Sequence, residues 1–222
     1  MTNEDPPPGP VRRGFRTGRL EAFSDGVFAI AITLLVLDIA VPASAEAHLL
    51  RSVADLWPSY LAYVASVSTI GGLWIGHVAV TEYLVRTDVA FVRLNLLLLL
   101  VVAFLPFPTR LFAEFLGKTS PERVAATIYG LSLLLASALL LVLWRYALRN
   151  RLVRPDAADE EVQFLTKRLT PGVTGYPVLI IAGLFIPVLA VAGYLAVALY
   201  YIIPLRGSST IPFRRQRRLP QP

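Results

Sequence analysis

The chain has 222 residues, of which 55% are hydrophobic and 16% charged, whereas soluble domains carry about a quarter charged residues. It contains no cysteine, which excludes disulfide scaffolds, thiolate catalysis and iron–sulfur sites. Its formal net charge is +6, but the basic residues lie in loops and tails beside long apolar segments. This pattern predicts an integral membrane protein and gives no reason to expect a nucleic-acid partner.

Residues 1–17 are polar and proline-rich at their start, and we expect a disordered cytosolic tail. The first apolar segment, residues 20–41, ends before Pro42. About 20 helical residues cross a hydrocarbon core of about 30 Å, so this length predicts a membrane span. The next three apolar segments predict further spans, at residues 53–84, 89–112 and 121–147.

The last apolar part of the chain is too long for one span. Residues 145–170 are mixed in charge and are predicted to lie partly as helix at the membrane surface. The stretch from 173 to 204 would reach roughly 48 Å as one helix. Pro187, near its middle, removes a helix hydrogen bond. We therefore expect two short helices here, at about 173–186 and 188–204, joined by a tight turn.

The predicted architecture is an all-α membrane protein with six transmembrane helices in one domain, residues 18–205, followed by a basic cytosolic tail, 206–222. The positions of the basic residues predict its orientation. Only four of the 21 Lys and Arg residues lie in segments predicted to be on the side opposite to the N-terminus, namely Arg51, Arg110, Lys118 and Arg123. The positive-inside rule then predicts cytoplasmic N- and C-termini for a multi-pass protein of the cell (inner) membrane bilayer.

Polar residues gather where the first predicted helix begins, in the sequence Arg19-Leu-Glu-Ala-Phe23-Ser24-Asp25. An ionisable group at membrane depth costs several kcal/mol unless it is paired or hydrated, so Asp25 requires a partner. A simpler interpretation is that Ser24 and Asp25 only cap the helix N-terminus.

The second and third predicted helices carry further polar candidates, namely Trp74, His77 and Asn95. A lone histidine in a membrane helix more often packs and forms hydrogen bonds than binds a ligand, although it could relay protons or sense pH. Asn95 is expected to bond across helices. We expect one network joining these helices, and no metal site. Its members would be Ser24, Asp25, His77 and Asn95, with Arg19 at one end.

One side of the first predicted helix is apolar. Ile30, Leu34 and Leu37 share this side at helical spacing, with Thr33 beside them. No charged residue lies between Asp25 and Asp38. Taken alone, such a stripe is more typical of packing than of a pore.

Three motifs together resemble a known family. Arg-x-x-x-Phe-Ser-Asp at 19–25, followed by Ala-Ile-x-x-Thr-x-x-x-Leu at 29–37, resembles the transmembrane-protein-175 family of potassium channels. Trp74-x-x-His77 and Phe-Leu-Pro-Phe-Pro-Thr at 104–109 resemble its prokaryotic branch. The resemblance covers about residues 19–205. It implies six helices per protomer and a homotetramer whose first helices line a central pore for K⁺.

The resemblance also implies roles for residues. Ile30 would form a narrow hydrophobic constriction, Thr33 a hydroxyl layer, and Leu37 a second apolar ring, with Leu34 lining the same path. A narrow apolar ring gates by dewetting, and a wider one lets a partly dehydrated K⁺ pass. The residues around the Phe-Ser-Asp motif would position the first helix, and no cofactor besides the permeant K⁺ is expected.

A carrier and an enzyme are the two alternatives to a channel. A proton-coupled carrier would use Asp25 and His77 as its relay, but mid-membrane acidic groups are absent from the later helices and no internal repeat is visible. An enzyme is not expected, because the sequence shows no pattern typical of a Ser–His pair, a catalytic carboxylate cluster or a phosphate-binding glycine loop.

Overall fold

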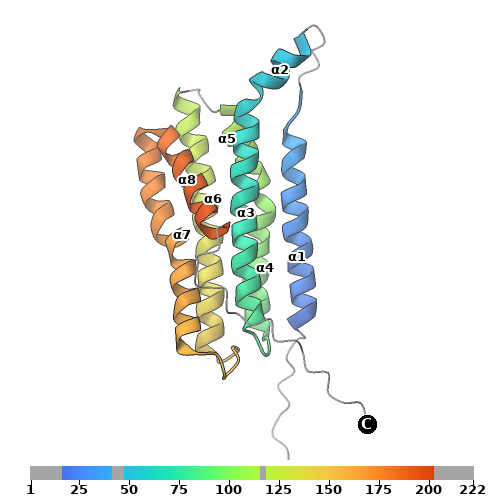
Figure 1. The fold of residues 1–222 in the computed structure, drawn as a ribbon, viewed down its shortest axis with the longest axis vertical. Coiled ribbons are helices and arrows are strands. Elements are labelled where there is room, and N and C mark those ends of the chain that lie inside the picture. The colour runs from blue at the N-terminus through green and yellow to red at the C-terminus, as the bar shows by residue number, and fades with distance from the viewer. Residues whose placement is uncertain (1–16, 42–47, 116–118, 203–222) are drawn as a thin grey trace, which may run out of the picture.

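The protein is a bundle of long helices in the computed structural model, which describes residues 17–41, 48–115 and 119–202 (Figure 1). The predicted tails therefore lie outside the described residues, except for Thr17, where the first helix begins. The elements are α1 (Thr17–Leu34), the 3₁₀ helix η1 (Leu35–Asp38), α2 (Leu49–Asp55), α3 (Trp57–Glu82), α4 (Val89–Phe104), α5 (Pro106–Phe115), α6 (Thr119–Arg149), α7 (Asp159–Phe185) and α8 (Pro187–Ile202).

Five described segments are long and apolar enough to cross a membrane. These are Thr17–Asp38, Trp57–Glu82, Val89–Phe115, Pro121–Arg149 and Asp159–Phe185. The predicted all-α membrane architecture is thus confirmed. The sixth span stays a prediction, because α8 has 16 residues and reaches only about 24 Å.

Prolines divide the helices, in part where we expected. The predicted break before Pro187 is present, since α7 ends at Phe185 and α8 begins at Pro187. The predicted helix 89–112 is instead interrupted after Phe104, because Pro106 has no amide hydrogen to continue the α-helical bonding. The chain tightens there, and the Leu105 amide donates to the Val102 carbonyl.

The prediction of a separate surface segment over residues 145–170 was wrong in its extent. Helix α6 continues to Arg149, and α7 begins at Asp159 and runs for 27 residues, so the expected short helix 173–186 is the second part of a longer one. Asp159 and the two glutamates after it place negative charge in the first turn of α7, which favours a helix start.

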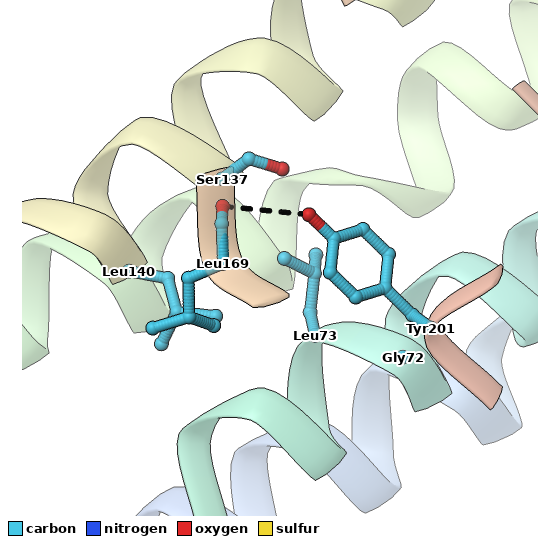
Figure 2. Close-up of a pocket in the computed structure, with 6 residues that line it drawn as sticks. All are labelled: Gly72, Leu73, Ser137, Leu140, Leu169 and Tyr201. Carbon is cyan, nitrogen blue, oxygen red and sulfur yellow. Dashed lines mark hydrogen bonds between the residues drawn. The ribbon is translucent and has the colours of Figure 1, made fainter. Parts of the chain in front are cut away.

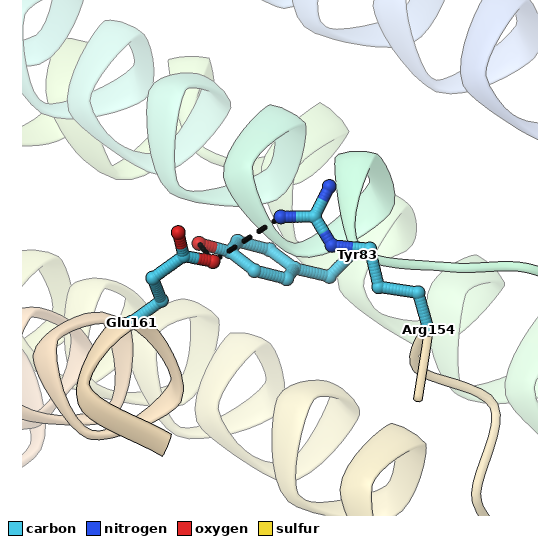
Figure 3. A network of polar contacts seen from close by, with 3 residues as sticks. All are labelled: Tyr83, Arg154 and Glu161. Carbon is cyan, nitrogen blue, oxygen red and sulfur yellow. Dashed lines mark hydrogen bonds and ion pairs between the residues drawn. The ribbon is translucent and has the colours of Figure 1, made fainter. Parts of the chain in front are cut away.

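The α3–α4 loop contacts the α6–α7 loop and the first turn of α7 through three side chains, Tyr83, Arg154 and Glu161, which we call the clasp (Figure 3). The Arg154 amide donates to the Tyr83 carbonyl at 2.9 Å, and the Val85 amide donates to the Leu152 carbonyl at 3.0 Å. The Arg154 guanidinium lies 4.7 Å from the Tyr83 ring centroid and 3.2 Å from Glu161 Oε2. Burial and the nearby Glu161 raise the pKa of the Tyr83 hydroxyl, which stays protonated and donates to Glu161 at 3.4 Å.

Candidate functional site

Helix α1 lies at the edge of the bundle and packs on α3 and α4 (Figure 1). One of its faces is buried against these helices, and it consists of Leu20, Ser24, Phe28 and Ala31, continued by Leu35 in η1. Their spacing of three or four residues is that of one helix face. Val27 and Ile32 at its margins are partly buried, and the surface opposite to this face is left uncovered by the protomer.

The four residues predicted to line a pore all lie on this uncovered surface. Ile30 is 60% exposed, Leu34 43% and Leu37 72%, and Thr33 is exposed beside them. The change from α to 3₁₀ geometry after Leu34 keeps Leu37 in line with it, because side chains three apart eclipse in a 3₁₀ helix. The Thr33 hydroxyl donates to the Ile30 carbonyl at 2.9 Å, so its oxygen remains able to accept.

The opposite face of α1 is held by a buried hydrogen-bond chain that crosses three helices. Ser24 Oγ donates to the Leu20 carbonyl at 2.8 Å and therefore accepts from Asn95 Nδ2 at 2.9 Å. This fixes the Asn95 amide, whose Oδ1 faces His77 Nε2 at 2.8 Å. His77 Nε2 must then carry the hydrogen. All three side chains are at most 1% exposed, and the Phe28 ring packs 5.5 Å from the His77 ring.

Asp25 belongs to a separate contact. Its Oδ1 accepts from Trp74 Nε1 at 2.8 Å, at an exposed position between α1 and α3. The single network expected from the sequence is therefore two sets of bonds. Arg19 is exposed and joins neither of them, and Phe23, 57% exposed, lies on the uncovered surface of α1.

A second buried polar group was missed by the sequence analysis. Ser66 Oγ lies 2.8 Å from Thr109 Oγ1 and 2.9 Å from the Tyr129 hydroxyl, which ties α3, α5 and α6 together. The Tyr129 ring stacks on Phe112 and meets Tyr194 edge to face. A signal was present, because a tyrosine in a membrane span requires a partner for its hydroxyl.

The site can hold a helix in place, but it offers little acid–base chemistry on its uncovered side. From Gly26 to Leu37 that surface carries no ionisable group. It can present only apolar side chains and the Thr33 oxygen to whatever covers it.

Comparison with known proteins places this site within a family. Residues 19–106, which include both faces of α1 and the buried chain, match the family model described as the endosomal/lysosomal potassium channel TMEM175. A potassium channel of Streptomyces collinus is 41% identical over 187 residues, covering 83% of this chain and 91% of the relative. A potassium channel of Chamaesiphon minutus is 46% identical over 162 residues, covering 70% and 79%.

A solved structure agrees with the sequence relatives. The crystal structure of a lysosomal potassium-selective channel TMEM175 homolog from Chamaesiphon minutus superposes with a TM-score of 0.76 at 41% identity. The match covers 84% of this chain and 96% of that one. Since the similarity extends over most of the length of these relatives in both sequence and fold, the chain belongs to the TMEM175 family.

Proposed function

We propose that this chain is a potassium-selective channel, and that four copies assemble with their α1 helices around a central K⁺ pore. One observation carries the proposal. The apolar surface of α1 with Ile30 and Leu37 is left uncovered, while the opposite face is fixed by Ser24 and its buried partners. A helix held in this way presents one surface in a defined direction.

A path between copies is favoured over a path through one protomer. The interior of the described bundle is filled by large side chains, among them Trp144, Tyr176 and Tyr194. Protein interiors packed in this way leave no room for a continuous ion path. The α1 surface is a suitable wall for a shared path, because it is uncharged from Gly26 to Leu37.

We assign the constriction to Ile30 and a second apolar ring to Leu37, with Leu34 and Thr33 between them. Four apolar side chains around a narrow axis exclude water, so the pore can gate by dewetting. On widening, a cation that has lost part of its hydration shell can pass, and the Thr33 oxygens offer it partial compensation. Trp74, His77 and Asn95 are assigned to positioning α1 rather than to ion contact.

The proposed topology places both termini in the cytoplasm of a cell whose inner membrane holds the channel, with α8 as the sixth crossing. This rests on the distribution of Lys and Arg between the loops. Proton-coupled transport would need exchange between Asp25 and His77. These residues bond instead to different partners, Trp74 and Asn95, which favours the channel.

Reconstituted protein tests the function directly. In liposomes with a K⁺/Na⁺ gradient, the reversal potential should lie toward the K⁺ equilibrium value. Ile30→Asn should wet the constriction and raise the K⁺ flux. Ile181→Asn is a matched control, because Ile181 of α7 is also 60% exposed. Unchanged flux in Ile30→Asn with intact assembly, or an equal rise in the control, would contradict the assignment.

Assembly can be tested separately, because the chain has no native cysteine. Leu37→Cys should form disulfide-linked dimers on mild oxidation if α1 surrounds an axis. Ile181→Cys, on the outer side of α7, should remain monomeric under the same conditions. If only Ile181→Cys cross-linked, α1 would face lipid and the central pore would have to be abandoned.

A further inference from the structure

A small cavity of about 10 Å³ lies inside the bundle, away from α1 (Figure 2). It lies between α3, α6, α7 and α8, and its lining is mostly apolar. Two hydroxyl-bearing side chains also line it, Ser137 of α6 and Tyr201 of α8. Both side chains are buried, at 4% and 8% exposure.

The Ser137 hydroxyl forms no hydrogen bond with the described residues. This is unusual for its helix, because Thr127 and Ser132 both donate to the carbonyl four residues earlier. A buried hydroxyl without a partner costs about 1–3 kcal/mol. Such groups are therefore normally satisfied by protein or by ordered water.

The Tyr201 hydroxyl is only partly satisfied. It accepts from the Gly172 amide at 2.8 Å, but its own donation to the Leu169 carbonyl is long, at 3.5 Å (Figure 2). Pro171 lies beside this contact, inside α7. Pro171 has no amide hydrogen for the carbonyl of Lys167, four residues earlier, so the Leu169 carbonyl that Tyr201 reaches is a different group.

Gly172 opens the space between the two hydroxyls. A Cβ at this position would lie 2.7 Å from Ser137 Oγ and 2.8 Å from the Tyr201 hydroxyl oxygen. These two distances show that both oxygens border the same small space and lie within reach of one bridging molecule. A larger residue at 172 would fill that space.

We propose that this cavity is a binding site for one ordered water molecule, which bridges Ser137 Oγ of α6 and the Tyr201 hydroxyl of α8. The cavity has room for one water molecule, and two polar partners are present. Two neutral oxygens would not offset the cost of burying a cation, so a neutral ligand fits better. The site is independent of the proposed ion conduction.

The water would help α8 to hold α3. Tyr201 packs on α3 at Gly72, where a Cβ would meet the Tyr201 Cβ at 2.7 Å. A hydroxyl fixed by water on one side and by Gly172 on the other restrains the Tyr201 ring against this glycine. The ordered water therefore belongs to the contact between the outer helices and α3.

X-ray radiolytic hydroxyl labelling of the full-length protein tests the proposal, because bound water is converted to radicals that label adjacent side chains. Tyr201 should be labelled several times more than Tyr176, which is 1% exposed and outside the cavity lining. Ser137→Val should abolish the excess by filling the site. Ser132→Val, on the same helix, should leave it unchanged.

Two results would overturn the proposal. Labelling of Tyr201 no greater than that of Tyr176 would show a dry cavity, with the Ser137 hydroxyl turned onto its own helix. Labelling that persists in Ser137→Val would show that the radicals come from bulk solvent. Ser137→Ala gives a second check if the valine variant fails to fold, because it removes one bridging partner without adding bulk and should also lose the excess.

Discussion

Trp74 Nε1 and Asp25 Oδ1 are joined by a 2.8 Å hydrogen bond between α3 and α1, directly next to Ser24, which α4 holds through Asn95. Two consecutive residues of α1 are thus fixed by two different helices. A helix held at two points around its axis cannot rotate freely. The direction of Ile30, five residues after Asp25, therefore depends on these bonds.

Trp74→Phe removes the indole donor and leaves the Asp25 carboxylate without this partner. We expect a lower thermal midpoint in detergent and altered K⁺ flux, because α1 gains rotational freedom. A hydrogen bond to a charged group contributes about 1.5–3 kcal/mol, and less where water also reaches the carboxylate. Trp57→Phe, at another exposed tryptophan of α3, is the control. Equal effects of both variants would show that the bond does not hold α1.

Asp25→Asn separates the charge from the hydrogen bond at the same position. The asparagine keeps a carbonyl oxygen that can accept from Trp74. We expect it to retain most of the stability that Trp74→Phe loses. A loss equal to that of the tryptophan variant would mean that the negative charge, rather than the bond, holds the helix.

The chain from His77 through Asn95 to Ser24 should behave as one unit. Asn95→Leu leaves His77 Nε2 buried without a partner, which costs about 1–3 kcal/mol. His77→Phe removes the ring nitrogen that the Asn95→Leu substitution would leave unpaired. We therefore expect the double variant to be less destabilised than the sum of the single variants, by roughly 0.5–3 kcal/mol in chemical unfolding. Additive losses would show that the three side chains act independently.

Adjacent glycines in α3 provide a matched pair. A Cβ at Gly72 would meet Tyr201 at 2.7 Å, whereas a Cβ at Gly71 would meet nothing within 4 Å. Gly72→Ala should separate α8 from α3 and lower the thermal midpoint. Gly71→Ala should be neutral or stabilising within the protomer, because alanine favours helix by up to about 1 kcal/mol. A marked loss in Gly71→Ala would point to a contact with another copy at that surface.

The sequence predicts the spans well where apolar length decides them, as in α3 and α6. It also identifies Ser24, Asp25, His77 and Asn95 as polar residues in need of partners, because the membrane interior makes that need general. It does not assign the partners. The pairing of Asp25 with Trp74, and of Ser24 with Asn95, depends on the rotation of α1 between two helices, which residue spacing along one helix does not determine.

Local charge misled the interpretation of α7. Residues 159–170 are polar enough to suggest a surface segment, yet they continue into the apolar part as one helix. Tertiary contacts decide this, since the buried Trp144 of α6 donates to Thr166 Oγ1 at 2.8 Å. The Ser66, Thr109 and Tyr129 group was also missed, because its hydrogen bonds join side chains from three helices and depend on tertiary packing.

The clasp between the two loops should depend on Tyr83 more than on its ion pair. The Arg154 and Glu161 side chains are 41% and 45% exposed, and exposed pairs contribute only about 0–1 kcal/mol. Glu161→Gln should therefore have a small effect on the free energy of unfolding, and that effect should shrink at high salt.

Tyr83→Ala should cost considerably more, about 3 kcal/mol or above by analogy with other buried aromatic residues. The Tyr83 ring is buried, and the Arg154 guanidinium lies over its face. It also packs edge to face against the Trp144 ring, with the two ring centroids 5.7 Å apart. Tyr83→Phe separates the ring from the hydroxyl. Because the hydroxyl bond to Glu161 is long, this variant should retain most of the stability. If Glu161→Gln were as damaging as Tyr83→Ala, electrostatic attraction rather than aromatic packing would hold the loops together.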